Sequence, residues 1–305
     1  MENSAKKPLS RRTFLKASTL IATGAAITFG AISVPLLRSE RRLLRPPGAL
    51  AEDHFLSSCI KCGQCLQVCP PQVIHLAGIS QGFGIGTPYI TPREGGCILC
   101  SGLPCVLACP TGALDHHLSL GKDAEMGLAV LTRPGTCLSV LGENDLVHRL
   151  KQLQRVKGKV IGSSELDDIL DGLVKRLTGE EKAKLLDHFS LPGGSEQIMS
   201  QLTGKIREAD LQWLTEFVSG SAQARHSCRV CLDDCPIRDE KTIVFETGTN
   251  PKTGRETLIP TVQKSCVGCG VCEEKCPTTV ASIIISPQLQ WADRKTARQD
   301  HNRTS

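Results

Sequence analysis

The chain has 305 residues, which is enough for one or two domains. Its formal net charge is +5, but residues 1–50 hold nine Lys and Arg against two Glu, which leaves 27 basic and 29 acidic side chains elsewhere. Because the basic excess belongs to the N-terminal segment, the rest of the chain has no charge signature of a nucleic-acid-binding protein. Aromatic residues make up only 3% of the sequence, whereas cysteine occurs 16 times. This composition predicts that bound metal cofactors replace part of the usual core packing.

The N-terminal region, residues 1–50, has the pattern of an export signal. Ser10-Arg11-Arg12-Thr13-Phe14-Leu15-Lys16 stands directly before an apolar run from Ala17 to Leu37. Twin arginines followed by Phe-Leu-Lys are typical of the bacterial twin-arginine signal, whereas the basic flank of an ordinary membrane helix does not require the whole string. This route carries folded proteins, so metal centres can be assembled in the reducing cytoplasm before export. The sequence therefore predicts a periplasmic protein.

The sequence leaves two fates open for this leader. Ala49-Leu50-Ala51 has the A-x-A form of a cleavage site, but it lies well past the apolar run. The run from Ala17 to Leu37 is just long enough to span a bilayer, although its many Ala, Gly, Ser and Thr residues make it a weak permanent anchor. We favour export with cleavage and keep an uncleaved membrane anchor as the alternative.

The first cysteine group, Cys59-x2-Cys62-x2-Cys65-x3-Cys69-Pro70, has the spacing with which bacterial ferredoxins hold a [4Fe–4S] cluster. Three thiolates on one tight loop bind one cluster, and the fourth reaches to a second cluster, so one such group implies a partner group. A glycine such as Gly63 suits a loop whose backbone N–H groups must point at sulfur. The spacing therefore predicts an iron–sulfur protein.

All sixteen cysteines fall into four such groups. The fourth group repeats the first spacing, and the second has two additional residues before its third cysteine. The third group lacks its first cysteine unless Cys137, the one left over, completes it. We expect four [4Fe–4S] clusters in which every cysteine is a ligand. The predicted ligands are Cys59, Cys62, Cys65, Cys69, Cys97, Cys100, Cys105, Cys109, Cys137, Cys228, Cys231, Cys235, Cys266, Cys269, Cys272 and Cys276.

Three other kinds of cysteine site fit this pattern less well. Zinc sites are usually built from two separated C-x2-C pairs, not from a triple spacing that ends in Cys-Pro. An exported chain with an even number of cysteines could carry disulfides, but cysteines only two residues apart seldom bridge. A c-type haem requires C-x-x-C-H, and no C-x-x-C in this sequence is followed by His.

Short apolar segments between the cysteine groups have the length and composition of β-strands. Residues 250–254, Asn-Pro-Lys-Thr-Gly, predict a turn between two of these strands. Short strands between cluster loops indicate the α+β fold class, with small bacterial ferredoxin-like modules. The predicted strands lie at residues 73–76, 113–114, 128–131, 242–245, 257–259 and 282–285.

Residues 141–225 contain no cysteine and have the periodicity of amphipathic helices. Thr178-x-x-Glu181 has the form of a capping box, and Leu-Pro-Gly-Gly at residues 191–194 predicts a break. The simplest interpretation is a small helical bundle without chemistry, and the alternative is a docking surface for a partner. The apolar positions expected to face its core are Leu166, Ile169, Leu170, Leu173, Val174, Leu177, Ile198, Leu202, Ile206, Leu211, Leu214 and Val218.

The order of these features resembles the periplasmic ferredoxin-type proteins of the NapG/MauM family. The resemblance covers residues 45–140 and 226–286. The strings that carry it are Arg45-Pro46-Pro47-Gly48-Ala49, Cys62-Gly63-Gln64-Cys65, Gly86-Thr87-Pro88-Tyr89, Gly112-Ala113-Leu114-Asp115, Met126-Gly127-Leu128-Ala129-Val130-Leu131, and Leu258-Ile259-Pro260-Thr261-Val262 before Cys266-Val267-Gly268-Cys269-Gly270.

In that family the first two cysteines of the third group are a few residues apart, so the resemblance implies that the helical segment is an insertion between Cys137 and Cys228. The expected fold is a set of tandem or nested ferredoxin-like modules with a helical insertion. The expected parts are the signal region at 1–50, cluster domain segments at 51–140 and 226–290, the helical insertion at 141–225 and a polar tail at 291–305.

The resemblance implies an electron carrier, not an enzyme. Family members act with a membrane-bound polyferredoxin that oxidises quinol, and they supply a periplasmic reductase such as nitrate reductase, or a cytochrome. MauM members belong to methylamine oxidation instead. The sequence itself predicts no small-molecule substrate, because no G-x-G-x-x-G follows a strand and the eight His lack the spacing of a catalytic triad. His116 and His117 lie near a cluster loop and are the mild exceptions.

Two other functions remain possible at this point. An iron–sulfur maturation protein would hold or deliver clusters for a partner enzyme, but delivery takes place in the cytoplasm and the export signal favours the relay. A reductase with a catalytic site of its own is the weaker alternative. Reduction of nitrate by the purified chain alone would favour the reductase, and we expect none.

The resemblance to four-cluster proteins also implies how the groups pair. It implies a nested arrangement, in which the outer groups share clusters and the inner groups share clusters. The alternative pairs neighbours along the chain, first with second and third with fourth. Nested pairing would join Cys59, Cys62 and Cys65 with Cys276; Cys266, Cys269 and Cys272 with Cys69; Cys97, Cys100 and Cys105 with Cys235; and Cys137, Cys228 and Cys231 with Cys109.

Overall fold

The structure is a computed structural model, and it describes residues 43–155, 164–190, 206, 208–221, 227–250 and 252–287, together with Arg12, Ser18, Thr19, Thr23 and Gly24. Most of the predicted leader and the polar tail at 291–305 therefore lie outside the described residues. Within the described residues, no helix is both long enough and apolar enough to cross a membrane.

The N-terminal cysteine module, residues 43–124, consists of short helices around one hairpin. Strands β1 (Ile74–Leu76) and β2 (Pro88–Ile90) pair antiparallel, with His75 opposite Tyr89. Ile74 and Ile90 are buried and oppose each other, so this pair anchors the hairpin in the core. The other elements are α2 (Glu52–Ser58), α3 (Gln64–Gln67), η1 (Ile79–Gly84), α4 (Pro104–Leu107) and η2 (Gly121–Asp123).

The C-terminal cysteine module joins two stretches of chain, residues 126–143 and 227–287. Strand β3 (Leu128–Leu131) pairs antiparallel with β6 (Ile283–Ser286), and this pairing closes the module. Strands β4 (Ile243–Thr249) and β5 (Glu256–Val262) form a hairpin. The expected turn is confirmed, because the Asn250 side-chain oxygen accepts hydrogen bonds from the next described N–H groups. The other elements are η3 (Pro134–Thr136), α5 (Leu138–Leu141), α11 (Val230–Asp233), η6 (Arg238–Glu240) and α12 (Val271–Glu274).

Between these two stretches lies a helical block, residues 145–221, with its own hydrophobic core. The predicted capping box is confirmed: the Thr178 hydroxyl accepts a hydrogen bond from the Glu181 N–H, and the Glu181 carboxylate accepts one from the Thr178 N–H. The expected break at residues 191–194 and the positions Ile198 and Leu202 lie outside the described residues. The helices are α6 (Asp145–Arg155), α7 (Ser164–Arg176), α8 (Gly179–His188) and α10 (Glu208–Gly220).

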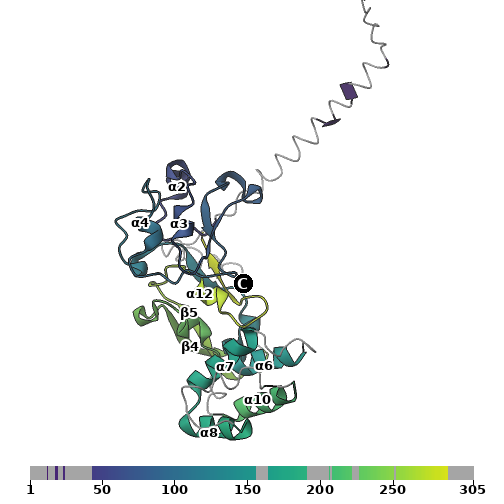
Figure 1. Cartoon of the computed structure of the whole chain (residues 1–305). Helices are drawn as coiled ribbons and strands as arrows, with labels where there is room; N and C mark the ends of the chain where they lie inside the picture. The colour runs from purple at the N-terminus through teal and green to yellow at the C-terminus, as the bar shows by residue number, and fades with distance from the viewer. Residues whose placement is uncertain are drawn as a thin grey trace, which may run out of the picture.

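The mixture of short sheets and helices places the chain in the α+β class. The two cysteine modules share one hydrophobic core, and several cysteines belong to it. In Figure 1, α3 and α4 lie at one end, α12 in the middle and the helical block at the other end. Five of the six predicted strand segments lie in strands, whereas residues 113–114 form only an isolated bridge between Leu114 and Ala49. Strand β2 was not predicted, because three residues that begin with proline are too few to show the alternation of apolar and polar side chains that is typical of a strand.

Candidate metal centres

Left-handed backbone positions bend the cysteine loops. In three of the four groups the residue two positions after the first cysteine has a positive φ: 60° at Lys61, 53° at Leu99 and 74° at Gly268. Gly63, the glycine singled out from the sequence, also has a positive φ of 73°. Only glycine fits at residue 268, because a Cβ there would overlap the backbone of Gly127. These turns keep the thiols of one loop on the same side.

The third cysteine of every group occupies the same place in a four-residue helix. Cys65, Cys105, Cys231 and Cys272 are each the second residue of α3, α4, α11 and α12. The third group shares this local backbone although its first cysteine is far away in sequence. The repeat therefore extends to all four groups.

The first small cavity is lined by four thiols from two groups. Cys97, Cys100 and Cys105 of the second group face it together with Cys69 of the first group. Its other walls are proline, valine, leucine and isoleucine side chains. Burial raises the pKa of Cys105 to about 12, and the charges of Cys97 and Cys69 contribute to the rise. We call these four cysteines set 2.

A second cavity is lined by five thiols, of which we call Cys137, Cys228, Cys231 and Cys276 set 3; the fifth is Cys272. The structure thus brings Cys137 to the third group across residues 138–227. A hydrogen bond of 2.9 Å from the Cys228 N–H to the Glu143 carbonyl oxygen holds the two stretches together. Burial raises the pKa of Cys231 to about 12, and the charges of Cys137 and Cys276 add to it.

The thiols of set 1 are Cys59, Cys62, Cys65 and Cys109. Burial raises the pKa of Cys65 to about 11, and the charges of the three other thiols raise it as well, so all four lie close together. Cys62 is the most exposed of the sixteen cysteines, and it places this set at the surface.

The thiols of set 4 are Cys266, Cys269, Cys272 and Cys235. Burial raises the pKa of Cys269 to about 12, and the charges of Cys235 and Cys266 contribute. Burial raises the pKa of Cys272, and the charges of Cys269, Cys266, Cys231 and Cys235 raise it further. All four sets therefore take three thiols from one group and one from another.

The groups pair with their neighbours along the chain, and the nested pairing expected from the family resemblance is wrong. The second group's Cys109 lies with the loop of the first group, and the first group's Cys69 lies with the loop of the second. The third and fourth groups exchange Cys235 and Cys276 in the same way. The physical reason is the short distance that the fourth cysteine of a group can extend from the third. Only three residues separate the last two cysteines of a group, so the fourth thiol extends to the loop packed beside it, where α3 contacts α4 and α11 contacts α12.

Hydrogen-bond donors surround two of the exchanged sulfurs. The Leu114 N–H donates to the Cys109 Sγ at 3.4 Å, and the Ser282 N–H donates to the Cys276 Sγ at 3.4 Å. Burial pushes the pKa of Cys109 upward, but the N–H groups of Leu114, Thr111 and Ala113 outweigh it and lower that pKa. A sulfur in such surroundings is stabilised as a thiolate, the form that binds iron.

These thiol sets fit [4Fe–4S] clusters in donor chemistry and arrangement. A cube takes four thiolates, one on each iron, so its ligands surround a space and do not converge on one point. In the described part of the chain, no three His, Cys, Asp or Glu residues converge closely enough to hold a single metal ion. Apolar walls and backbone N–H donors around sulfur are the protein features that tune such clusters.

One residue that sequence reasoning missed connects the two cysteine modules. The Arg93 guanidinium donates hydrogen bonds to the carbonyl oxygens of Glu273, Cys276 and Thr278 at 2.8, 2.9 and 2.8 Å. An arginine outside any motif gives no sequence signal for this contact, since its partners lie far along the chain. His116, noted from the sequence, contacts the Cys109 carbonyl oxygen at 2.8 Å through Nε2.

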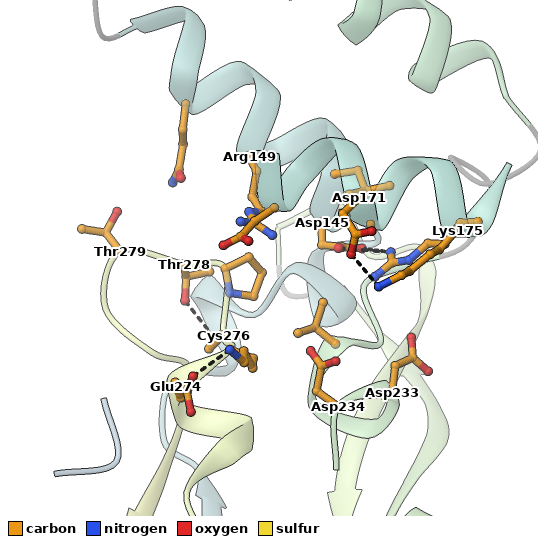
Figure 2. A pocket seen from close by; sticks show the side chains of 18 of the residues that line it. Asp145, Arg149, Asp171, Lys175, Asp233, Asp234, Glu274, Cys276, Thr278 and Thr279 are labelled. Atoms are coloured by element: carbon orange, nitrogen blue, oxygen red, sulfur yellow. Dashed lines mark hydrogen bonds and ion pairs between the residues drawn. The ribbon is translucent and has the colours of Figure 1, made fainter. Parts of the chain in front are cut away.

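A cleft of about 980 Å³ separates the helical block from the C-terminal module and reaches Cys276. Figure 2 shows Asp145, Arg149 and Lys175 on the helical side of the cleft, with Cys276 and Thr278 opposite. An ion pair of 2.9 Å between Arg176 and the buried carboxylate of Asp145 stabilises the helical side. Charged side chains of both signs line this cleft, so it differs from the apolar cavities of the thiol sets.

The two modules and their thiol sets define an iron–sulfur protein of the ferredoxin type. Residues 58–113 match the family described as a 4Fe-4S dicluster domain, and residues 263–279 match a 4Fe-4S binding domain. The first match covers the first and second cysteine groups together, in agreement with their sharing of thiols. No solved structure matches the chain.

Curated relatives cover nearly the whole chain. The ferredoxin-type protein NapG of Haemophilus influenzae is 30% identical over 94% of this chain and 75% of its own length. NapG of Escherichia coli is 29% identical over 94% of this chain and 90% of its own length. The methylamine utilization ferredoxin-type protein MauM of Paracoccus denitrificans is 28% identical over 93% and 91%. The chain belongs to the NapG/MauM family of ferredoxin-type proteins, with [4Fe–4S] cofactors and a role in electron transfer.

Proposed function

We propose that this chain is a periplasmic relay that passes electrons through four [4Fe–4S] clusters and has no catalytic site of its own. The observation that carries the proposal is the gathering of all sixteen cysteines into four sets of four thiols. When bound, each cluster supplies a centre that accepts and releases one electron without bond making. The chain holds the thiolates, surrounds sets 2 and 3 with mainly apolar walls and directs N–H groups at the sulfurs of Cys109 and Cys276.

The proposed partners follow from the family. A membrane-bound, quinol-oxidising polyferredoxin supplies electrons, and a periplasmic reductase of the nitrate reductase kind, or a cytochrome, accepts them. The twin-arginine string at residues 10–16 supports export of the loaded chain, with the leader either cleaved or kept as an anchor. Residues 141–225 are proposed to be an insertion that divides the C-terminal module, and the separate core of the helical block supports this.

The first test is the cluster content of protein purified without oxygen. We expect about 16 iron and about 16 sulfide per chain, since sixteen thiolates at one per iron fill four cubes. Low-temperature EPR spectra should develop signals of reduced [4Fe–4S] clusters when dithionite is added. A count of about 8 iron would show that only two sets are filled. Bound zinc without cluster absorption would overturn the proposal.

The similarity to MauM favours a second candidate, the same relay in methylamine oxidation. The two candidates share every thiol set and differ only in their redox partners. Reoxidation of the reduced chain by a periplasmic nitrate reductase, compared with that by the electron acceptors of methylamine oxidation, distinguishes them. Faster reoxidation by the nitrate system supports the first candidate.

A further inference from the structure

The contacts between the thiol sets give them an order in space. Set 1 adjoins set 2, because α3, which carries Cys65, packs against α4, which carries Cys105. These two sets also exchange their fourth thiols, Cys109 and Cys69. The first link therefore lies within the N-terminal module.

The second link crosses between the modules. The Cys97 N–H of set 2 donates a hydrogen bond of 2.8 Å to the carbonyl oxygen of Cys269 of set 4. Beside it, Gly96 approaches so closely that a Cβ on this residue would overlap the backbone of Val271. Set 2 thus adjoins set 4, although the third cysteine group comes before the fourth in sequence.

The third link lies within the C-terminal module. Cys272 of set 4 lines the same cavity as the four thiols of set 3. Helix α11, which carries Cys231, packs against α12, which carries Cys272. Set 4 consequently has neighbours on two sides, set 2 and set 3.

We propose that electrons cross the protein in single file, in the order set 1, set 2, set 4, set 3. This inference rests on the proposed function and adds the sequence of steps to it. In each step one electron passes between neighbouring clusters, so that one is oxidised as the next is reduced, and no bond or proton is exchanged. The first and last sets exchange electrons with the two redox partners.

The two ends of this file lie far apart and have different surroundings. Set 1 reaches the surface at Cys62, next to Ile60, which is 64% exposed. Set 3 borders the charged cleft, where Cys276 faces the helical block (Figure 2). In Figure 1, α3 and the helical block lie at opposite ends of the protein, so two partners can dock at once.

The order is tested by removing one cluster and reading the magnetic coupling among the rest. Neighbouring reduced clusters broaden each other's EPR signals, whereas an isolated one gives a narrow, uncoupled signal. The inner-set variant is Cys266→Ala with Cys272→Ala, which disables set 4. The matched outer-set variant is Cys137→Ala with Cys228→Ala, which disables set 3. Each should retain about 12 iron per chain.

We expect about one uncoupled cluster per chain in the inner-set variant, because the cluster of set 3 loses its only neighbour in the file, and none in the outer-set variant. An uncoupled signal in the outer-set variant alone, in both variants or in neither variant would overturn the order.

If the alanine variants lose more iron than expected, Cys266→Ser and Cys137→Ser replace them. Serine supplies an oxygen ligand and lowers the reduction potential of the cluster that it binds. When the solution potential is set above that lowered value and below the potentials of the other clusters, only this cluster stays oxidised. It then couples to no neighbour, so the two variants can be compared in the same way. Fewer than four clusters in the unchanged chain would instead refute the proposed function.

Discussion

The hydroxyl of a Cys-Pro-Thr string lies beside a proposed ligand in set 3. The Thr278 Oγ1 is 3.2 Å from the Cys276 Sγ and 2.8 Å from the Val280 carbonyl oxygen. The Thr278 hydroxyl donates to the Val280 carbonyl oxygen, and because an iron-bound sulfur can only accept, the same hydroxyl hydrogen is then shared with the Cys276 Sγ. Hydrogen bonds to sulfur favour the reduced cluster, whose sulfurs carry more negative charge. A single side chain therefore influences the potential at one end of the proposed file.

We expect Thr278→Val to lower the reduction potential of one cluster by about 40 mV, because a hydrogen bond worth about 1 kcal/mol in a one-electron couple corresponds to that shift. An EPR-monitored redox titration measures it. The control is Thr279→Val, which alters an exposed neighbour without a side-chain bond to sulfur and should leave all potentials unchanged. Equal shifts in both variants would show that the hydroxyl of Thr278 is not the cause.

At the scale of elements, α5 explains how the helical block can interrupt a cysteine set. The Ser139 hydroxyl donates to the Leu258 carbonyl oxygen at 2.8 Å, and the Thr257 hydroxyl donates to the Ser139 carbonyl oxygen at 2.7 Å. These bonds hold α5 against β5, and they thereby hold Cys137, which directly precedes α5, in its place in set 3. The helical block has a core of its own. Glu143, which precedes the block in sequence, and Cys228, which follows it, are hydrogen-bonded to each other.

Deletion of residues 144–226, with a short glycine and serine linker from Glu143 to Ser227, should therefore leave about 16 iron per chain. The cysteine modules keep all their ligands and the bonds of α5. As a control, a longer deletion of residues 137–226 removes Cys137 itself and should reduce the count to about 12 iron, since set 3 loses one of its four ligands. Loss of all clusters in the shorter deletion would show that the helical block belongs to the cluster-binding core.

For the whole molecule, the exchange of thiols stays within each module, because sets 1 and 2 use only the first two cysteine groups and sets 3 and 4 only the last two. The modules then meet through the Cys97–Cys269 hydrogen bond and the bonds of Arg93 to the loop around Cys276.

We expect Arg11→Lys combined with Arg12→Lys to abolish recovery of the protein from the periplasm, because the signal is read by a receptor and positive charge alone does not replace it. Cell fractionation with an antibody against the chain measures the distribution, and the cluster-loaded protein should collect in the cytoplasm. Lys6→Arg with Lys7→Arg keeps the charge and the twin arginines and should be exported normally. Unchanged periplasmic recovery of the twin-lysine variant would refute the export proposal.

The sequence alone determined the chemistry of this protein, because ligand spacing is a local property. In the first and fourth groups three thiols lie within seven residues and fix one face of a cluster whatever the rest of the chain does, so the cofactor and the family could be read directly. The strands of the C-terminal module and the capping box of α8 also follow from local patterns, and the structure contains them.

Only the tertiary structure decided which thiols share a set, because that depends on which loops pack together. The fourth cysteine of each group follows the third at the same spacing throughout, so nothing in the local sequence distinguishes nested from neighbouring partners. Packing of α3 on α4 and of α11 on α12 made the choice. The same holds for Cys137, which reaches set 3 through the bond between Glu143 and Cys228, and for the approach of Cys97 to Cys269, which places set 4 between sets 2 and 3.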